Sequence, residues 1–531
     1  MATPVNENGG AESEGRIAPP QRIEPVTQAP RSGLRGLISR IERSCGAAAL
    51  VFLLLAGVFG VVWSVVTPAF WGHDEITQFG RAYQVAHGGY LPQKIHDDRG
   101  PAWGGNVPVS IDALMNYAFN DYQDTPDEPD PMVKDPAAYD RLGGAAVSDQ
   151  TKQVWFTNTA AYSPIPYVPA AVGIRIAEAT GADVGDTVEM TRLAGLLAYL
   201  LIVFCALRSL RGHRVQWLAL TVSVLPIAVF QAGTVTADTV TNALAILVSA
   251  LIVKGLFLGQ RLTRPETVAA LAATVLLPVC KPTYVLLAML TVLIPVRRFG
   301  FGRHRLLADG SEPVAGWQRV IPWACAAVGA IAFAAWMKIA APTGDGMSLM
   351  RPQKQWGTVR PGDQLHGILS DPIHFLRVFG DSIARRDQHW FTQFFGELGF
   401  SYVDVPALTI LASLLAFAMS IGTAERFTGA AADRLRTWLV LLTMLASVAM
   451  IYVTLYMSFT PVGYFIIDGV QGRYFVPLAL LTLCVLLRWM PLRLTGIDGR
   501  IPVRGAAITV TIATTVAMIA AVVKYTTIVW G

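Results

Sequence analysis

Long apolar stretches recur from about residue 46 to the C-terminus, and short polar segments separate them. A helix needs roughly 20 apolar residues to cross a bilayer core that is about 30 Å thick. Eleven stretches approach or reach this length: residues 46–68, 189–207, 216–232, 238–258, 266–280, 283–296, 317–339, 405–423, 437–457, 474–490 and 505–528. The pattern predicts an all-α integral membrane protein with about eleven transmembrane helices.

The N-terminal segment has a different pattern. Residues 1–33 are rich in Pro, Gly, Asn, Gln and Glu, which is typical of a disordered tail. Residues 34–43 alternate apolar side chains with arginines, and this suits a short helix lying at the membrane interface. We therefore expect residues 1–45 to form a cytoplasmic tail with an interfacial helix, and residues 46–531 to form one polytopic membrane domain.

Basic residues occupy alternate loops, which predicts the orientation of the chain. The short connections 233–237 and 458–472 contain no Lys or Arg. The basic loops and their borders carry Arg208, Arg211, Arg214, Arg261, Arg264, Arg297, Arg298, Arg303, Arg305, Arg426, Arg434, Arg436, Arg488, Arg493, Arg500 and Arg504. Basic loops are retained in the cytoplasm, so the N-terminus is predicted to be cytoplasmic and the protein to be multi-pass in the cytoplasmic membrane.

One apolar segment, residues 164–179, is predicted not to cross. It would cover only about 24 Å as a helix, and a crossing here would invert the arginine pattern. We expect it to be a juxtamembrane helix in a large first outer loop, residues 69–188. A second large outer loop follows at 340–404, where residues 374–400 mix aromatic side chains with arginines, as in an amphipathic surface helix.

Composition narrows the class of protein further. Hydrophobic residues make up 53% of the chain and charged residues 15%, against about 25% charged in soluble proteins. This excludes a soluble enzyme, a secreted disulfide-rich module and a mostly disordered chain. The net charge of +5 comes from the loop arginines, so no nucleic-acid partner is predicted. The five cysteines and eight histidines show no metal-ligand spacing, and no nucleotide-binding glycine loop is present.

Two adjacent acids, Asp74 and Glu75, stand just beyond the first predicted span. They could serve as a general base and its orienting partner. At a helix start they would point to different faces, so we do not expect them to share a proton. In the structural alternative, Asp74 simply caps a helix that runs to Ala86. Two acids could also hold a divalent metal, but no spacing demands one and no cofactor is firmly implied.

Three further charged residues are predicted at outer ends of spans. Asp238 could be a helix cap or part of a site. Lys281 is the only charge in a tight outer connection, which makes it a candidate anion binder. Arg473 stands at another outer mouth and could instead pair with Asp468. An acid with nearby cations is what transfer from a phosphate leaving group needs.

The chain resembles a bacterial family of polytopic membrane proteins catalogued only as a domain of unknown function. The resemblance covers roughly residues 60–490. It is carried by Asp74-Glu75 with Phe79 and Arg81-Ala82-Tyr83-Gln84, Gly88, Leu91-Pro92, Pro164-Ile165-Pro166-Tyr167, Lys281-Pro282-Thr283-Tyr284, Gly396-Glu397-Leu398-Gly399 with Pro406, and Gln471-Gly472-Arg473-Tyr474-Phe475. The chain departs from the family pattern at His73, at 76–78 and in an insertion around 110–150.

That family in turn resembles the GT-C superfamily of membrane glycosyltransferases. Members have an Asp-Glu after the first span, a proline-led juxtamembrane helix, an Arg-Leu opening the second span and an acid in the second outer connection. Asp74-Glu75, residues 164–179, Arg192-Leu193 and Asp238 occupy those places here. The resemblance implies a GT-C-like fold and use of polyprenyl-phosphate sugars, usually without a nucleotide at the active site.

From these residues we predict an inverting glycosyltransferase that acts outside the cytoplasmic membrane. Asp74 would accept the proton of the acceptor, and Glu75 and Asp238 would orient the substrates. Cations for the leaving phosphate would be Arg81, Lys281 and Arg473.

The predicted partners are a polyprenyl-phosphate sugar donor, an envelope glycan, lipid or protein acceptor, and membrane lipids. Two alternatives stay open: a transporter or flippase of a lipid-linked sugar, and a non-catalytic envelope-assembly protein.

Overall fold

The computed structural model describes residues 34–97, 100–121, 130–301, 315–344, 359–400, 403–425, 427, 433–490 and 503–531. The predicted disordered tail, residues 1–33, lies outside them, as do parts of three basic loops. The chain divides into two units, Met1–Ser44 and Cys45–Gly531. The first contains most of α1 (Leu34–Cys45), a helix where the sequence predicts one, and its interfacial placement stays a prediction.

Seven helices among the described residues are long and apolar enough to cross a membrane. Three of them are α2 (Ala47–Val66), α8 (Val184–Ser209) and α19 (Arg434–Ser458). The fourth, Asp238–Phe257, consists of α11 (Asp238–Ile252) and the π-helical turn η2 (Val253–Phe257). The other three are Gly316–Gly344, which contains α14 (Gly316–Ala340), Gly472–Trp489, which joins η7 (Gly472–Phe475) to α20 (Val476–Trp489), and Arg504–Trp530, which lies within α21 (Val503–Trp530). Each matches a predicted span. The mostly helical membrane architecture is therefore as predicted.

The other four predicted spans form shorter helices, so the count of eleven stays a prediction. Residues 266–280 lie in α12 (Arg264–Cys280) and 405–423 in α18 (Ala407–Thr423). Residues 283–296 form three short consecutive helices, η3 (Pro282–Tyr284), α13 (Val285–Met289) and η4 (Leu290–Leu293), before a further turn η5 (Val296–Arg298).

The expectation of one continuous helix over 216–232 is wrong. The chain forms α9 (Gln216–Ser223) and α10 (Pro226–Ala232), and Leu225 between them is extended, with φ −57° and ψ 137°. Pro226 lacks an N–H donor and disfavours helical backbone in the residue before it, so the helix restarts at the proline.

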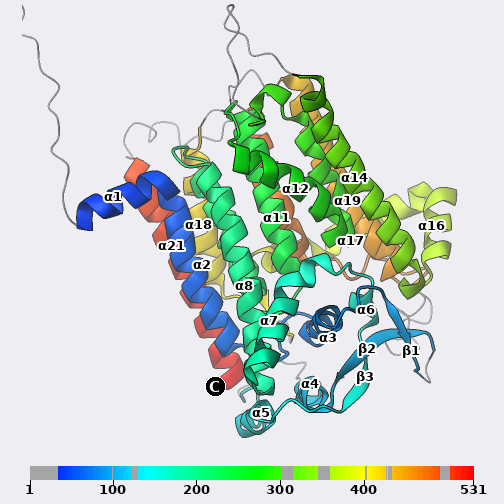
Figure 1. Ribbon diagram of the computed structural model, residues 1–531. Helices are drawn as coiled ribbons and strands as arrows, with labels where there is room; N and C mark the ends of the chain where they lie inside the picture. The colour runs from blue at the N-terminus through cyan, green and yellow to red at the C-terminus, as the bar shows by residue number, and fades with distance from the viewer. Residues whose placement is uncertain are drawn as a thin grey trace, which may run out of the picture. The chain divides into compact units, whose positions relative to one another are not determined.

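The helix α11 forms the centre of the bundle. Nearly all of it is buried inside the protein, and α8, α12 and α20 pack against it. Figure 1 shows these helices running side by side, with α2, α18 and α21 beyond α8. Because Asp238 is the first residue of α11, its place at the end of the central helix is fixed by packing on several sides.

The first large loop folds as a mixed α and β structure, and the all-α prediction is wrong here. Strands β1 (Gln93–Ile95), β2 (Ala102–Pro108) and β3 (Thr151–Trp155) form an antiparallel sheet in the order β1-β2-β3. Gly104 pairs with Gln93 and Trp155, and a Cβ there would lie 2.0 Å from the Val154 carbonyl oxygen. The strands are too short and too irregular to stand out from the hydrophobic pattern.

Helices lie with this sheet at one end of the bundle, and some of them contact it (Figure 1). They are α3 (Glu75–Ala86), α4 (Val109–Asp121), α5 (Pro136–Gly143), α6 (Thr157–Ala160), η1 (Ile165–Tyr167) and α7 (Val168–Thr180). The proline-led segment 164–179 is therefore η1 and α7, and it packs against α8 and α3. The 13 residues of α7 span about 20 Å, and α7 is not among the candidate spans.

The second large loop contributes α16 (Pro361–Ser370), α17 (Pro372–Phe395) and the two-stranded pair β4 (Glu397–Leu398) and β5 (Val403–Asp404). The amphipathic helix expected around 374–400 is α17. It packs against η7, the short turn that precedes α20. This contact brings the second loop to the segment that contains Arg473.

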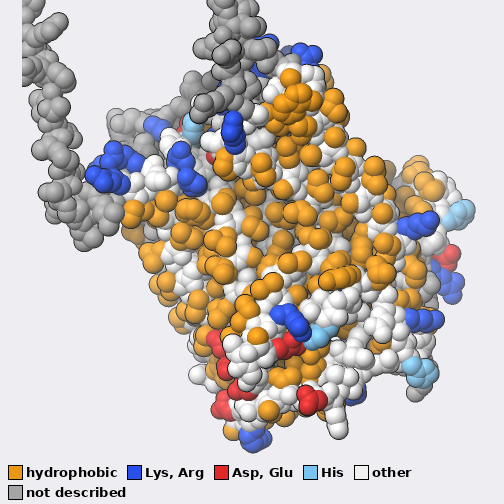
Figure 2. Space-filling model, in the orientation of Figure 1, with side chains coloured by type: hydrophobic (Ala, Val, Ile, Leu, Met, Phe, Trp, Pro, Cys, Tyr) orange, Lys and Arg blue, Asp and Glu red, His pale blue; other side chains and the backbone are white. Residues whose placement is uncertain are grey.

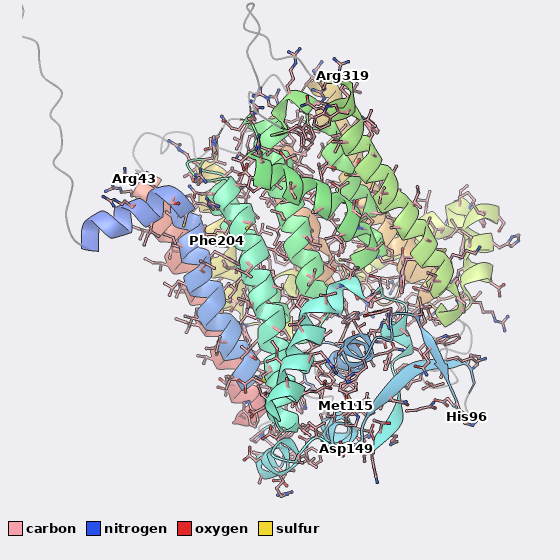
Figure 3. All side chains as sticks on the ribbon, viewed as in Figure 1. Arg43, His96, Met115, Asp149, Phe204 and Arg319 are labelled. Carbon is pink, nitrogen blue, oxygen red and sulfur yellow. The ribbon has the colours of Figure 1, made fainter. Side chains whose placement is uncertain are left out.

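The surface separates side chains by type. In Figure 2 hydrophobic side chains cover the middle of the helix bundle, and the visible acidic side chains lie mainly at the end that holds α4 and α5. Figure 3 places Arg319 at one end of the bundle and His96, Met115 and Asp149 at the opposite end. This distribution is typical of a membrane protein with chemically different sides, and the predicted orientation stays a prediction.

Candidate functional site

Four of the candidate residues come together: Asp74, Asp238, Lys281 and Arg473. Asp238 lies at the centre of this group, which we call the charged cluster. Its carboxylate accepts hydrogen bonds from Lys281 Nζ at 2.6 Å and from Gln231 Nε2 at 2.9 Å. Arg473 Nε lies 3.8 Å from Asp238 Oδ2. Buried charges need this kind of pairing, because an isolated charge loses its hydration without compensation.

Asp74 joins the charged cluster from the first loop. Its Oδ2 lies 3.7 Å from Arg473 Nη2, and its side chain remains 43% exposed. Asp74 is the N-cap residue of α3, as the structural alternative predicts, but its carboxyl group makes no capping hydrogen bond to that helix. Asp74 is thus the cluster's accessible carboxyl group.

The backbone of Asp74 is in the left-handed region, with φ 54° and ψ 21°. This conformation is uncommon for residues other than glycine, although Asp and Asn adopt it more readily than most. Such conformations persist only where neighbouring structure fixes them, and they gather at functional sites. The turn at Asp74 is therefore held by the residues on either side of it.

Glu75 supplies this support. Arg192 donates from Nε to Glu75 Oε1 at 2.8 Å and from Nη2 to Oε2 at 2.5 Å. The same carboxylate accepts from the Gly72 and Val235 backbone amides, each at 2.9 Å. Glu75 is completely buried, and Arg192 also donates to the carbonyls of residues 64, 67 and 68. Glu75 therefore ties the turn to α2, α8 and the start of α11, and it lies outside the charged cluster.

Arg81 also serves the loop structure. Its guanidinium donates to the side chain of Gln84 and to the carbonyl oxygens of Gly89, Tyr90 and Tyr162. The side chain is completely buried. The structure does not bring Arg81 into the charged cluster, because its donors close the loop that follows α3.

Lys281 lies at a break between two helices. Pro278 and Pro282 flank it, and its own backbone is extended, with φ −149° and ψ 120°. Its Nζ lies 4.3 Å from the centre of the Tyr474 ring, and the Arg473 guanidinium carbon lies 5.5 Å from the same centre. The two cations therefore share an aromatic ring as well as Asp238, an arrangement that stabilises positive charge away from bulk water.

Arg473 is placed by the contact between η7 and α17. The Gly472 amide donates to Gln393 Oε1 at 2.8 Å, and Trp390 Nε1 donates to the Val470 carbonyl at 2.9 Å. A Cβ on Gly472 would lie 2.1 Å from the Trp390 carbonyl oxygen, so only glycine allows this approach. The sequence left open a pairing of Arg473 with Asp468. In the structure, the Asp468 carboxylate accepts a hydrogen bond from the Gly469 amide at 3.0 Å.

Two buried titratable residues next to the cluster, His73 and Glu397, were not predicted as site residues. His73 precedes Asp74, and the nearby Glu397 backbone partly opposes the effect of burial on the pKa of its ring. Burial and then Arg473 lower the pKa of His73, which keeps the ring neutral at pH 7. The available signal was position: His73 adjoins the acids, and Glu397 lies in the Gly396–Gly399 motif.

Two of the carboxyl groups near Arg473, those of Glu397 and Asp74, bind protons more readily than usual. Burial raises the pKa of Glu397 to about 7, against the opposing effect of Arg473. Partial loss of hydration raises the pKa of Asp74, which Arg473 and Lys281 counteract and Asp238 reinforces. A carboxyl group with a raised pKa is a better proton acceptor than an ordinary aspartate.

The charged cluster thus combines one accessible carboxyl group with two cations held by a buried carboxylate. Such a site can bind an anion at the cations and accept a proton at Asp74. Within the described parts of the chain, no group of three or more His, Cys, Asp or Glu side chains could hold a metal ion.

Comparisons with known proteins add a family and a structural likeness. A family model described as "Predicted membrane protein (DUF2142)" matches residues 57–482. No match is found among curated proteins. Among solved structures, the chain is similar to the crystal structure of ArnT from Cupriavidus metallidurans in the apo state. The identity is 14%, over 90% of this chain and 77% of that chain, with a TM-score of 0.32.

Proposed function

The chain belongs to the DUF2142 family of predicted membrane proteins. We propose that it is an inverting membrane glycosyltransferase. It moves a sugar from a polyprenyl-phosphate carrier to a hydroxyl group of an envelope acceptor. The observation that carries this proposal is the meeting of Asp74 with Arg473, beside Lys281, at the end of the central helix. The resemblance of its motifs to the GT-C superfamily gives the reaction class.

In the proposed step, the acceptor oxygen attacks the anomeric carbon of the donor. A carbon–oxygen bond forms there while the bond from the same carbon to the phosphate oxygen breaks. The acceptor proton passes to Asp74, and the polyprenyl phosphate leaves with one more negative charge. The raised pKa of Asp74 supports this role, because a general base works best when its pKa lies near the working pH.

Lys281 and Arg473 stabilise the charge that develops on the leaving phosphate. Cations that are already in position, in a site shielded from water, act without reorganisation during the reaction. Asp238 holds both cations, through the 2.6 Å hydrogen bond to Lys281 and the 3.8 Å approach to Arg473. In this proposal Asp238 positions the cations, and Glu75 and Arg81 build the loop around Asp74.

We place this site on the outer face of the cytoplasmic membrane. The proposed topology has a cytoplasmic N-terminus, residues 46–531 as a GT-C-like domain with about eleven crossings, and outer loops at 69–188 and 340–404. The absence of Lys and Arg from 233–237 and 458–472, which flank the cluster, supports this side. Polyprenyl-linked sugars and envelope acceptors meet on that face.

The test uses membranes from cells that make the normal chain, Asp74→Asn or Asp149→Asn. Asp149 is an exposed acid in the same loop and serves as the matched control. Radiolabelled polyprenyl-phosphate sugars are supplied, and label is followed into lipid and polymer fractions. Transfer by the normal chain and by Asp149→Asn, but not by Asp74→Asn, is expected. Label that stays on every carrier tested would contradict transfer and favour a flippase or an assembly protein.

A further inference from the structure

A hollow lies next to the charged cluster, between α17 and the segment that leads into η7. It encloses about 360 Å³, and its lining residues are Arg386, His389, Trp390, Gln393, Glu397, Phe459 and 467–471. Asp74, Asp238, Lys281 and Arg473 are not among them. The hollow, which we call the α17 pocket, is large enough for a small ligand, since ligand pockets begin at about 300 Å³.

Two hydrogen-bonded connections join the α17 pocket to the charged cluster. Gln393 donates to Glu397 Oε2 at 2.6 Å and accepts from the Gly472 amide at 2.8 Å, one residue before Arg473. On the other side, the Glu397 backbone lies close enough to the His73 ring, one residue before Asp74, to raise its pKa. The Phe400 amide also donates to the Trp71 carbonyl at 2.6 Å. A ligand in the pocket would therefore lie beside both the base and the cations of the proposed reaction.

The polar groups of the pocket suit hydroxyl groups. Glu397 is buried, and burial raises its pKa to about 7, so near neutral pH it exchanges between donor and acceptor forms. Partial burial and then Arg386 lower the pKa of His389, whose ring nitrogen lies 2.8 Å from Gln393 Nε2. Gln471 Oε1 is buried and has no hydrogen-bond partner among the described residues. Amides, a neutral ring and a half-ionised carboxyl group offer both donors and acceptors.

The charge and the rings of the lining narrow the ligand class further. Arg386 is the one Lys or Arg among the lining residues, which also include the acids Glu397 and Asp468. A phosphate would gain little from such a balance. Trp390 and Phe459 add aromatic surface against which the apolar face of a sugar ring can pack. Mixed hydrogen-bonding groups beside aromatic rings are suited to a neutral, hydroxyl-rich ligand.

We propose that the α17 pocket is the acceptor subsite and that it takes a glycan, with Glu397 and Gln471 binding its hydroxyl groups. This inference rests on the proposed glycosyl transfer and narrows its acceptor to a carbohydrate. The donor phosphate stays with Lys281 and Arg473. The terminal sugar of the acceptor then reaches from the pocket toward Asp74, which takes the proton of the reacting hydroxyl.

The test measures binding of four methyl glycosides, those of glucose, galactose, mannose and arabinose, to the full chain in lipid nanodiscs. Saturation-transfer NMR reports each one. At least one glycoside is expected to bind, and Glu397→Ala is expected to weaken that binding by about tenfold, the value of one hydrogen bond to a charged group. His389→Ala, an exposed change in the pocket wall, should weaken it as well, even if Glu397→Ala does not fold.

Asp149→Asn changes an exposed acid that is not among the lining residues, and this matched control should bind the glycoside as the normal chain does. Undecaprenyl phosphate, which mimics the carrier, should not displace the glycoside. No binding by any of the four glycosides would overturn the subsite, as would equal loss in Asp149→Asn or displacement by undecaprenyl phosphate. Transfer that depends on Asp74 would then leave the proposed function standing without this acceptor pocket.

Discussion

Arg192 and Glu75, the residue that follows Asp74 in the sequence, form a buried bidentate ion pair. Arg192 Nε donates to Glu75 Oε1 at 2.8 Å, and Nη2 donates to Oε2 at 2.5 Å. Arg192 lies in α8, and Glu75 is the first residue of α3. The pair therefore joins the membrane bundle to the loop that carries the proposed base. Asp74 and Glu75 are neighbours in sequence with separate tasks, since one carboxylate faces Arg473 and the other faces Arg192.

Removing one partner of this pair should destabilise the protein. We expect Glu75→Gln to lower the free energy of unfolding by about 3–5 kcal/mol, because it leaves the Arg192 charge buried without its counter-ion. Thermal unfolding in detergent, monitored through the exposure of the buried cysteines, measures the change. The control is Glu189→Gln, at a half-buried position on α8, the helix that carries Arg192. Equal unfolding temperatures for Glu75→Gln and the control would contradict the structural role of Glu75.

The role of Lys281 can be separated from its contribution to folding. Lys281→Met should destabilise the chain by about 3–5 kcal/mol, because Asp238 loses its closest cation in a buried site. The double variant Asp238→Asn with Lys281→Met should recover most of that stability, since it removes both charges. It should still fail to transfer sugar. Normal transfer by a stable double variant would show that Lys281 has only a structural role.

Glu397 predicts a specific pH dependence of stability. Its pKa rises from an ordinary 4.5 to about 7 on folding, so between these values the folded chain binds more protons than the unfolded chain. The contribution of Glu397 to the free energy of unfolding is fully present below pH 4.5 and is lost as the pH rises toward 7. Glu397→Gln should remove this slope. Unfolding temperatures of both chains at pH 5, 6, 7 and 8 measure it, and parallel curves would contradict a buried, proton-binding Glu397.

The proposed topology can be tested with single cysteines in a chain whose own five cysteines are replaced. Thr151→Cys, exposed on β3, should react with a membrane-impermeant maleimide in intact cells. Arg211→Cys, exposed in the loop after α8, should react only after the membrane is opened. The expected difference follows from the retention of basic loops in the cytoplasm. The reverse labelling pattern would place the charged cluster on the cytoplasmic side.

The hydrophobic pattern identified the helices well because membrane spans are long, apolar and local in sequence. It could not resolve short elements. The break before Pro226 and the three short strands of the first loop depend on single residues, or on pairing between distant segments. Length and charge parity predict a helix that does not cross at the proline-led segment; the structure confirms the helix, α7, and its place outside the bilayer stays a prediction.

The candidate site was predictable as a set of residues but not as an arrangement. Their positions at predicted outer span ends predict that Asp74, Asp238, Lys281 and Arg473 lie on one side of the membrane. Their mutual distances depend on how α3, α11, α12 and η7 pack, and spacing along the chain does not encode this. Arg81 illustrates the limit, because its residue type suggested an anion site and its surroundings make it a structural link.

The central claim is that Asp74 is the base for sugar transfer, and single-turnover transfer by the purified chain tests it most directly. Radiolabelled polyprenyl-phosphate sugar is bound to the normal chain and to Asp74→Asn, and both the bound donor and the released polyprenyl phosphate are measured after acceptor is added. We predict that Asp74→Asn binds the donor through Lys281 and Arg473 but slows release by at least about 100-fold, the usual value of a positioned general base. Release at the normal rate from the variant would contradict the account.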